Sequence, residues 1–390
     1  MIRNITQRIR EEMIDLRAWN HGSNNDPEKP PKAVVVGGSI AGISCAHALI
    51  EAGWDVVVLE KTCAPPTGSP TGAGLGLDPL SLTIIQAWLK QPQLLQSSTL
   101  PLSIEQNQAT NAEKKISWIL TRDPNFNFRA AHWADLHSIL YNSLPSDIVL
   151  WGHYFLSFEI PDDKRSVTVK CKVLESGDTA EIVGDLLIAA DGCLSNIRKS
   201  FLPDFNLRYV NYSNSGNSVT TKVSDEMISR TNEEAEKVWC PELARLMRET
   251  REPFLNVIYD ADPLKQLFWN NVVLIGDAAH PTTPHGVRST NMSILDAAVL
   301  GKCLQKWGLE NLCSALEEYQ FIRLPVVSEQ VLHSRRVGRI KQGLSLPDRD
   351  TFDATIACPE ECDELQQKNM PFFTDVPSIL KDEQHFGATE

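Results

Sequence analysis

Glycines and one carboxylate near the N-terminus form a pattern that could bind phosphate groups. Gly37, Gly38 and Gly42 stand in the segment Gly-Gly-Ser-Ile-Ala-Gly, and Glu60 follows about twenty residues later. A glycine turn at the start of a helix offers backbone N–H groups, and the partial positive charge of the helix end favours a pyrophosphate. An acidic residue at this distance can accept hydrogen bonds from both hydroxyls of an adenosine ribose. The pattern predicts a dinucleotide-binding turn; an ordinary strand–turn–helix connection is the alternative.

A dinucleotide-binding turn requires a strand before it and a helix and second strand after it, and the sequence predicts all three. Residues 33–36 predict a buried strand, residues 43–51 a helix and residues 54–60 a second apolar strand. Together they make one βαβ unit of about 28 residues. Ser39 stands where the middle glycine of such a turn is usual, so its Cβ is expected to narrow the approach of the backbone to the phosphates.

Two later strands also end at a carboxylate beside a glycine. Residues 185–190 predict a strand that runs into Asp191-Gly192, and residues 272–275 predict one that runs into Gly276-Asp277. Each pair alone is a common turn former. The three motifs in this order are specific, and they resemble the three FAD fingerprints of the single-component (group A) flavin-dependent monooxygenases, the family of para-hydroxybenzoate hydroxylase and salicylate hydroxylase.

The resemblance covers residues 33–341. Residues 72–79 look like the family's glycine loop, and residues 316–325 look like its C-terminal helix signature. Residues 129–137 look most like plant members of the salicylate-hydroxylase-like branch. The family implies an α/β fold: a three-layer, Rossmann-type FAD-binding domain with an inserted, reduced mixed-sheet substrate domain.

The same resemblance divides the chain into segments. The expected segments are an N-terminal tail (1–32), the first parts of the FAD-binding domain (33–202), a remnant of the substrate domain (203–268), the rest of the FAD-binding domain with C-terminal helices (269–341) and an acidic tail (342–390).

The resemblance also assigns residues to FAD. The glycine turn would hold the pyrophosphate, Glu60 the ribose, and Asp277 the ribitol and pyrophosphate oxygens. Asp191 lies in the motif that in the family serves both FAD and the transient approach of NAD(P)H, the electron donor. The expected cofactor-binding residues are Gly37, Gly38, Ser39, Ala41, Gly42, Glu60, Lys61, Arg129, Asp191, Gly192, Gly276, Asp277, Pro284 and Asn291.

Two candidates for catalysis stand in the loop before the last predicted helix. His285 is a candidate proton group on the substrate side, with a loop hydrogen bond as the alternative. The family has Gly-Gly-Gln-Gly-x-Asn where this chain has Gly-Val-Arg-Ser-Thr-Asn at 286–291. Val287 and Ser289 therefore imply a shifted flavin ring or a looser contact with it, and Arg288 could place a positive charge beside it. Arg129 is a displaced substitute for a family arginine at the position of Trp133.

The interval between the second and third motifs is short for the family. Residues 211–218 are polar, and residues 232–249 predict one helix. Further on, a helix is expected at 291–307 with Ser289 and Thr290 as cap candidates, and another from residue 311 that must kink or break at Pro325. The acidic, proline-broken last fifty residues predict a mobile tail.

Composition narrows the functions that remain. A net charge of −13 over 390 residues disfavours binding to nucleic acid or anionic lipid. No apolar run reaches the ~18–20 residues of a membrane span, and no signal or transit peptide is evident. Nine scattered cysteines fit reduced thiols. We therefore expect an intracellular protein, cytoplasmic by default.

The function implied by the resemblance is an FAD-dependent, NAD(P)H-consuming monooxygenase. It would hydroxylate a small aromatic or N-heteroaromatic substrate with O₂ through a C4a-hydroperoxyflavin. One alternative is an FAD-dependent reductase or dehydrogenase, because related reductases share the later motifs. The other is an inactive flavin-binding remnant that acts through protein contacts, which the shortened middle region favours.

Overall fold

The computed structural model describes residues 29–66, 72–111, 113, 116–209, 220–250, 253–366 and 376–381. Most of the predicted N-terminal tail (1–28) and all of the polar segment 211–218 lie outside the described residues. The strands are β1 Lys32–Val36, β2 Asp55–Glu60, β3 Gly74–Leu77, β4 Thr99–Leu102, β5 Glu105–Asn111, β6 Ile116–Asp123, β7 Phe128–His132, β8 Val149–Trp151, β9 His153–Glu159, β10 Val167–Val173, β11 Thr179–Gly184, β12 Leu186–Ala189, β13 Arg208–Tyr209, β14 Thr220–Lys222, β15 Phe254–Asn256, β16 Tyr259–Asp260, β17 Phe268–Trp269 and β18 Val272–Leu274. The helices are α2 Ile40–Glu51, α3 Pro79–Trp88, α4 Gln93–Ser97, α5 Trp133–Ser143, α6 Asn196–Phe201, α7 Asp225–Val238, α8 Pro241–Glu249, α9 Ser289–Trp307, α10 Leu312–Lys341 and α11 Pro359–Asp363, with short 3₁₀ turns η1 Gly276–Ala278, η2 Pro284–Gly286 and η3 Leu309–Asn311.

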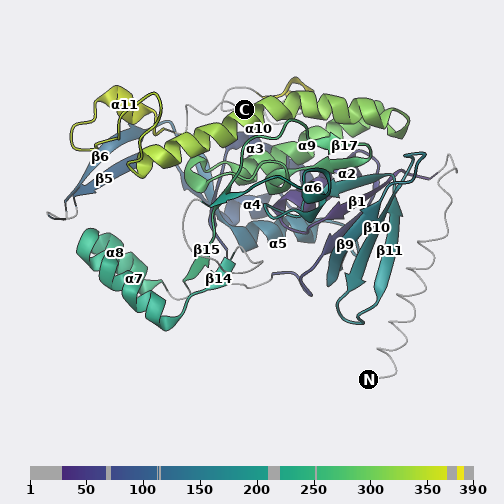
Figure 1. Cartoon of the computed structure of the whole chain (residues 1–390), viewed down its shortest axis with the longest axis horizontal. Coiled ribbons are helices and arrows are strands. Elements are labelled where there is room, and N and C mark those ends of the chain that lie inside the picture. The colour runs from purple at the N-terminus through teal and green to yellow at the C-terminus, as the bar shows by residue number, and fades with distance from the viewer. Residues whose placement is uncertain are drawn as a thin grey trace.

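A six-stranded sheet forms the centre of the molecule (Figure 1). Its order is β17-β18-β12-β1-β2-β8, and all neighbours are parallel except β17 and β18. Strands buried on both faces of a parallel sheet appear in a sequence as continuous apolar runs. This is why the strands predicted at 33–36, 54–60, 185–190 and 272–275 are confirmed as β1, β2, β12 and β18.

Helices and a second sheet complete three layers. Helix α2 packs against α9, which packs against α10. The contact between α2 and α9 depends on Gly301, because a Cβ there would lie 2.7 Å from the carbonyl oxygen of Ala48. The antiparallel sheet β11-β10-β9 contacts β1 and β12 and contributes Val167, Val169 and Ile182 to the core. The predicted α/β, Rossmann-type fold class is confirmed.

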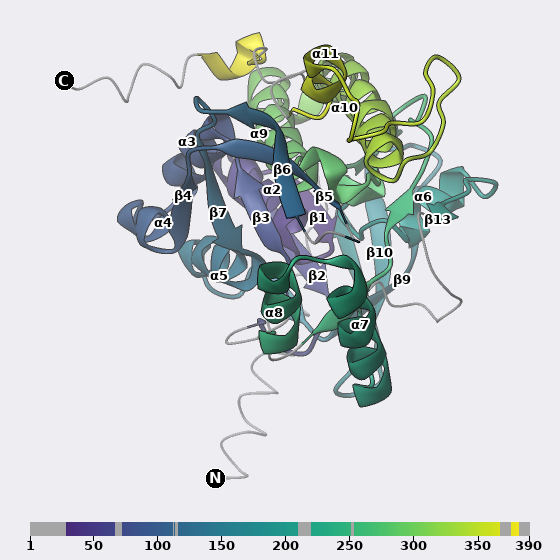
Figure 2. The ribbon, with the colours of Figure 1, turned by 90° about the vertical axis from the view of Figure 1, so that its left-hand side faces the viewer.

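The remaining strands lie outside this sandwich. Strands β3, β7 and β4 form an antiparallel sheet, and β5 pairs with β6 in a hairpin (Figure 2). Among the described residues between α6 and β17, the strands are only two or three residues long. These short pairs, β13 with β16 and β14 with β15, are all the sheet that the described part of the middle region contributes.

The single helix predicted at 232–249 is wrong. The structure has two helices, α7 and α8, which project from the body beyond β14 and β15 (Figure 1). Ser224 caps α7 by accepting a hydrogen bond from the Met227 amide at 3.2 Å. Pro241 is the first residue of α8, and a proline in a helix interior would clash with the preceding turn, so the helix ends and restarts there.

Two other helix predictions are correct in part. The helix predicted at 291–307 is confirmed as α9, but it begins at Ser289, with Arg288 at the cap position and no side-chain cap bond, so Ser289 and Thr290 are not its caps. A second helix is confirmed as α10, Leu312–Lys341; it does not break at Pro325, and a kink there remains a prediction. Its buried residues recur at helical spacing on both sides of the proline, so packing against the core maintains the helix despite one lost backbone bond.

Residues 342–366 of the predicted mobile tail make defined contacts with the body of the protein, although most of their side chains are exposed. Arg336 of α10 pairs with Asp348 at 2.8 Å, and Arg349 pairs with Glu364 at 3.0 Å. The indole of Trp118 on β6 donates to the carbonyl of Ala354 at 3.2 Å. Acidic residues that composition would predict to repel are thus neutralised by arginines, and α11 lies beside the β5–β6 hairpin (Figure 1). Residues 367–375 and 382–390 lie outside the described residues.

In the part of the chain that the structure describes, no helix combines the length and apolar character needed to cross a bilayer.

Candidate functional site

The glycine turn after β1 is built by close backbone contacts. Gly37 has φ +108° and donates its amide to Leu59 at 2.8 Å. A Cβ at Gly37 would overlap the carbonyl of Ala190 at the end of β12, and one at Gly42 would overlap the Gly37 carbonyl. Only glycine permits these approaches, so the turn carries the start of α2 close to the ends of β2 and β12.

Glu60 is fixed beside this turn at the end of β2. Its Oε2 accepts the Gly38 amide at 2.7 Å, and its Oε1 accepts the Thr62 amide at 2.9 Å. A carboxylate has about four acceptor positions, so lone pairs remain for two ribose hydroxyls. Ser39 caps α2 without a side-chain bond and is exposed, as is Lys61. The predicted residues Gly37 to Gly42 and Glu60 therefore form one site.

Asp191 follows β12 and offers a buried acceptor. Its Oδ2 accepts the amides of Asn196 and Ile197 at 2.8 and 3.3 Å. Its Oδ1 is buried and has no hydrogen-bond partner among the described residues, and burial raises the pKa of this carboxyl group. Gly192 next to it has φ +79°. An unsatisfied buried oxygen beside the glycine turn fits a donor from a ligand.

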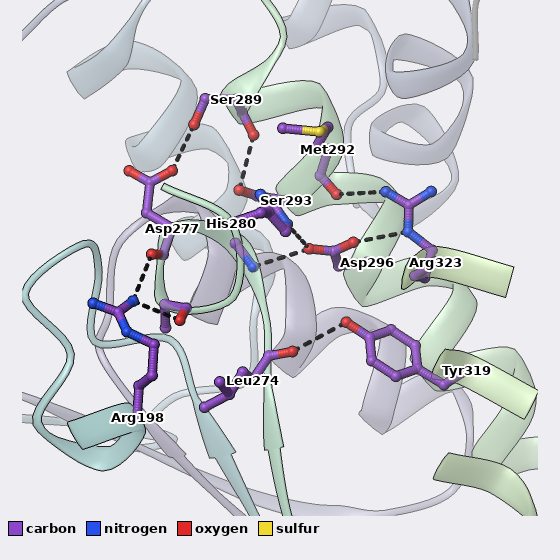
Figure 3. Close-up of polar contacts among 12 residues, drawn as sticks. Arg198, Leu274, Asp277, His280, Ser289, Met292, Ser293, Asp296, Tyr319 and Arg323 are labelled. Carbon is purple, nitrogen blue, oxygen red and sulfur yellow. Dashed lines mark hydrogen bonds and ion pairs between the residues drawn. The ribbon is translucent and has the colours of Figure 1, made fainter. Parts of the chain in front are cut away.

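The Gly276-Asp277 turn contacts the first motif directly. Gly276 has φ +55°, and a Cβ there would lie 2.9 Å from the Cβ of Ala41 and from Ser293 Oγ. Asp277 is half-buried, and its Oδ1 accepts the Ser289 hydroxyl at 2.7 Å (Figure 3). Ser289, predicted as a helix cap, thus orients the predicted cofactor carboxylate instead.

Arg198 joins the second motif to the third. Its guanidinium is fully buried and donates to the carbonyls of Ala278 at 2.7 Å and Asp277 at 3.3 Å, and also to Cys193 (Figure 3). It also lies 4.3 Å from the centre of the Phe205 ring. Sequence reasoning did not select Arg198 as a site residue, although its place seven residues after Asp191, inside the motif, was a usable signal.

A buried ionic network holds the third motif from behind. Asp296 on α9 accepts the Gly276 amide at 2.9 Å, His280 Nε2 at 2.5 Å and Arg323 Nε at 2.8 Å (Figure 3). Desolvation raises the pKa of Asp296, but interaction with His280 and Arg323 outweighs it and lowers the pKa to about 2. The carboxylate is therefore ionised and positions the Gly276 turn. Sequence reasoning missed this role for Asp296 and Arg323, which only the pairing of α9 with α10 reveals.

Asn291 and Arg288 connect the start of α9 to the glycine loop before α3. The side-chain Nδ2 of Asn291 donates to the Gly76 carbonyl at 2.8 Å, and its Oδ1 accepts a hydrogen bond from the backbone N–H of Asp78 at 3.0 Å. Arg288 NH1 pairs with Asp78 at 2.8 Å, and its guanidinium lies 4.9 Å from the Phe128 ring centre. Arg288 is 2% exposed, and burial lowers its pKa to about 10. Its charge is thus neutralised by Asp78 inside the protein.

The loop that carries His285 is strained. The His285 ring packs on α10, where a Cβ at Gly338 would lie 2.5 Å from its Cδ2, and burial together with Lys341 lowers its pKa. Pro284 precedes it at the start of η2 and is exposed. Val287 has φ +52° and is 43% exposed, a left-handed conformation that is rare for a β-branched residue.

Arg129 does not join the glycine turn. Its guanidinium donates to the Gln96 carbonyl at 3.0 Å and to the Thr99 carbonyl and hydroxyl at 2.8 and 2.5 Å. It therefore fixes the junction between α4 and β4. Within the described ranges, no group of three or more acidic, histidine or cysteine side chains could hold a metal ion.

The chain matches a known family over more than half its length. Residues 31–240 match the FAD binding domain family. The chain belongs to this family, that of the group A flavin-dependent monooxygenases, and it is an FAD-dependent oxidoreductase. NAD(P)H is the electron donor typical of the class.

Relatives and solved structures extend the likeness along the chain. The 6-hydroxynicotinate 3-monooxygenase of Pseudomonas fluorescens is 24% identical over 72% of this chain and 84% of that protein. The structure of Klebsiella pneumoniae HpxO complexed with FAD and uric acid has a TM-score of 0.66 at 22% identity and covers 87% of this chain and 94% of that one. A salicylate hydroxylase substrate complex has a TM-score of 0.67 at 18% identity and covers 91% and 97%.

The described residues fit FAD. The turn leaves no room for a Cβ at Gly37 or Gly42, Glu60 is pre-positioned, and Asp191 keeps a buried oxygen without a partner. All three motifs lie at the carboxyl ends of adjacent parallel strands, where nucleotides bind in α/β sheets.

Proposed function

We propose that the protein is a monooxygenase that hydroxylates a small aromatic or N-heteroaromatic substrate with O₂ and NAD(P)H. The observation that carries this proposal is the meeting of the three FAD motifs at the ends of β1, β12 and β18. Relatives named 6-hydroxynicotinate 3-monooxygenase and 3-hydroxybenzoate 6-hydroxylase support the substrate class.

FAD, when bound, supplies the redox chemistry: electrons from NAD(P)H and one oxygen atom of O₂ for the substrate ring. The residues of this chain bind and orient it. Amides of the turn at 37–42 would donate to the pyrophosphate, and Glu60 would accept ribose hydroxyls. Asp277, oriented by Ser289, would accept hydroxyls of the ribitol chain. Asp191 would accept one further donor at its Oδ1.

His285 is the proposed proton group on the substrate side. Burial and the nearby Lys341 lower its pKa, so the imidazole is neutral at neutral pH and can accept a proton from a phenol. Substitution of His285 by Gln should lower kcat for phenolic substrates and leave the rate of FAD reduction by NAD(P)H unchanged. An equal loss in both rates would show that His285 acts only through the fold.

The sequence predicts that Arg288 places a positive charge beside the flavin, but we propose a positioning role for it instead. Because it pairs with Asp78, it would fix the loop that carries His285 and Val287 rather than act on the reacting atoms. We also propose that segments 33–202 and 269–341 form the FAD-binding domain, with 203–268 as a reduced substrate domain. An intracellular location is proposed from the nine free cysteines.

A second candidate is an FAD reductase that oxidises NAD(P)H without inserting oxygen. The short strands and exposed apolar side chains of the described part of 203–268 favour it, because a hydroxylase must exclude water from the flavin. The third candidate function is that of an inactive flavin-binding remnant that acts through protein contacts.

The visible spectrum of the purified chain, with FAD and then NADPH or NADH added without air, tests the flavoenzyme. Flavin bands should bleach and return with oxygen. Turnover under ¹⁸O₂ with hydroxynicotinate, hydroxybenzoate and salicylate then separates the candidates. Label in a product supports the monooxygenase, whereas NAD(P)H oxidation that yields only hydrogen peroxide supports the reductase. A folded chain that binds FAD but is reduced by neither donor supports the flavin-binding remnant, and a folded chain that takes up no FAD contradicts all three flavin-binding candidates.

A further inference from the structure

A buried histidine outside the three motifs contacts the glycine turn. His137 on α5 is 1% exposed, and its Nε2 lies 2.7 Å from the Gly38 carbonyl oxygen. The amide of the same glycine donates to Glu60 at 2.7 Å. Gly38 is therefore held at both ends, its N–H by the ribose-binding carboxylate and its C=O by His137.

The surroundings of His137 fix both the ring and its tautomer. A carbonyl only accepts, so Nε2 carries the hydrogen, while Nδ1 is buried without a partner among the described residues. Burial lowers the pKa of His137, against opposing effects of the Gly38 bond and the Glu60 charge, so the ring is neutral. It stacks between Trp133 at 5.3 Å and Tyr141 at 6.2 Å.

The contact matters because of peptide geometry. In a planar trans peptide the C=O and the following N–H point in opposite directions. A Gly38 carbonyl that points at His137 thus turns the Ser39 N–H the other way, at the exposed N-cap of α2. Glycine resists rotation of this peptide weakly, since it has no Cβ, so a hydrogen bond is needed to hold one orientation.

We propose that His137 is a positioning residue for FAD: its Nε2–H holds the Gly38–Ser39 peptide so that the Ser39 amide and Glu60 face the pyrophosphate and ribose. This inference rests on FAD binding at the turn as described under the proposed function. It adds a residue from α5, 99 positions away from Gly38, to the machinery of the first motif.

His47 provides a matched control. It is also buried, at 7% exposure, its Nε2 lies 2.8 Å from the carbonyl of Leu140, and its ring stacks on Trp88 at 5.8 Å. Burial lowers its pKa as well. Its bond joins α2 to α5 and does not involve the turn. Removal of either imidazole deletes one buried histidine–carbonyl hydrogen bond, but only the bond of His137 is expected to affect FAD binding.

The test compares His137→Leu, His137→Gln and His47→Leu in the full chain. The measurements are the apo melting temperature, the FAD dissociation constant from flavin fluorescence, and hydrogen exchange of the peptide over 33–44 without FAD. His137→Leu should weaken FAD binding about fivefold or more, the size of one net hydrogen bond, and should speed exchange in the turn. His137→Gln, whose amide can donate, should restore most of both. His47→Leu should lower the melting temperature similarly and change FAD binding less than about twofold.

Three results would overturn the inference: wild-type FAD affinity in His137→Leu, equal weakening in His47→Leu, or no rescue by Gln. If His137→Leu does not fold, His137→Met, which fills the site with a flexible side chain, takes its place. If the wild-type chain binds no FAD, the cofactor proposal fails, and the exchange measurement still decides whether His137 orders the turn.

Discussion

The segments that carry the FAD motifs and the segment between them are packed in opposite ways. Around the motifs, Arg198, Asp296 and Arg323 are fully buried, and each makes several hydrogen bonds to parts of the chain distant in sequence. In the α7–α8 hairpin, Ala235 and Ala244 are the buried residues, while apolar side chains such as Leu246, at 65%, are exposed.

This difference shows in which parts of the molecule buried contacts fix the positions of the side chains. A buried network with many mutual hydrogen bonds favours one arrangement, because any shift would leave further charges or donors unpaired at low dielectric. In this network Arg198 Nε and Arg323 NH1 already lack a hydrogen-bond partner among the described residues. The helices α7 and α8 bury only one residue each, so fewer contacts constrain their position. The geometry around the FAD motifs is therefore determined in detail, whereas helices α7 and α8 bury little apolar surface.

The largest effect is expected from the removal of Asp296. Asp296→Ala leaves Arg323 buried without its carboxylate and frees the Gly276 amide, which should cost about 3–5 kcal/mol of unfolding free energy. Chemical denaturation of the apo protein measures this. A loss below about 1 kcal/mol would mean that the network is not a stabilising element of the cofactor side.

Asp277→Ala should remove FAD while the fold remains. The side chain is half-buried and bonded to Ser289, so its loss should weaken FAD by about 3 kcal/mol, two charge-assisted bonds, with little change in circular dichroism. Ser289→Ala is the matched control and should weaken FAD less. A full flavin complement in Asp277→Ala would refute the assignment of the third motif.

Acid should weaken the cofactor side first. The pKa of Asp296 is about 2 in the fold and about 3.9 in an unfolded chain, so the unfolded state binds the proton more readily. The resulting stabilisation, on the order of 2–3 kcal/mol, is complete above about pH 5 and lost as pH falls toward 2. The stability gap between wild type and Asp296→Asn should therefore shrink below pH 4; a gap that stays constant would argue against an ionised Asp296.

Glu60→Ala should have a milder effect on FAD. The lost carboxylate accepts the Gly38 amide and would accept ribose hydroxyls, so binding should weaken by about 1–3 kcal/mol. Isothermal titration of apo protein with FAD measures the change. Asp162→Ala removes an exposed carboxylate between β9 and β10 and should leave the affinity unchanged, and an equal loss there would point to a general charge effect.

The smallest change in unfolding free energy is expected in the α7–α8 helix pair. Leu246→Lys replaces an exposed apolar side chain on α8, so the unfolding free energy should change by no more than about 0.5 kcal/mol. The same measurement on Ala244→Lys, which is buried between the helices, should show a clear loss. A large loss of unfolding free energy for Leu246→Lys would mean that α8 is covered in solution. The two regions would then not differ in packing as described above.

Much of the cofactor side was predictable from the sequence. The apolar runs that became β1, β2, β12 and β18 are unambiguous because both faces of these strands are buried. Predictions failed where local signals competed with packing. Pro325 lies inside a helix that the core maintains, and residues 342–366 are held by arginines of α10 and of the segment itself.

The order of the motifs and the glycines of the turn can be identified in the chain alone, since these signals depend on neighbours a few residues apart. The side chains that hold those motifs in place become visible only when distant segments are packed together. His137 reaches Gly38 across 99 positions, Arg198 reaches Ala278 across 80, and Arg288 reaches Asp78 across 210. A buried polar group must find a partner wherever the fold provides one, and that partner leaves no periodic signal in the chain.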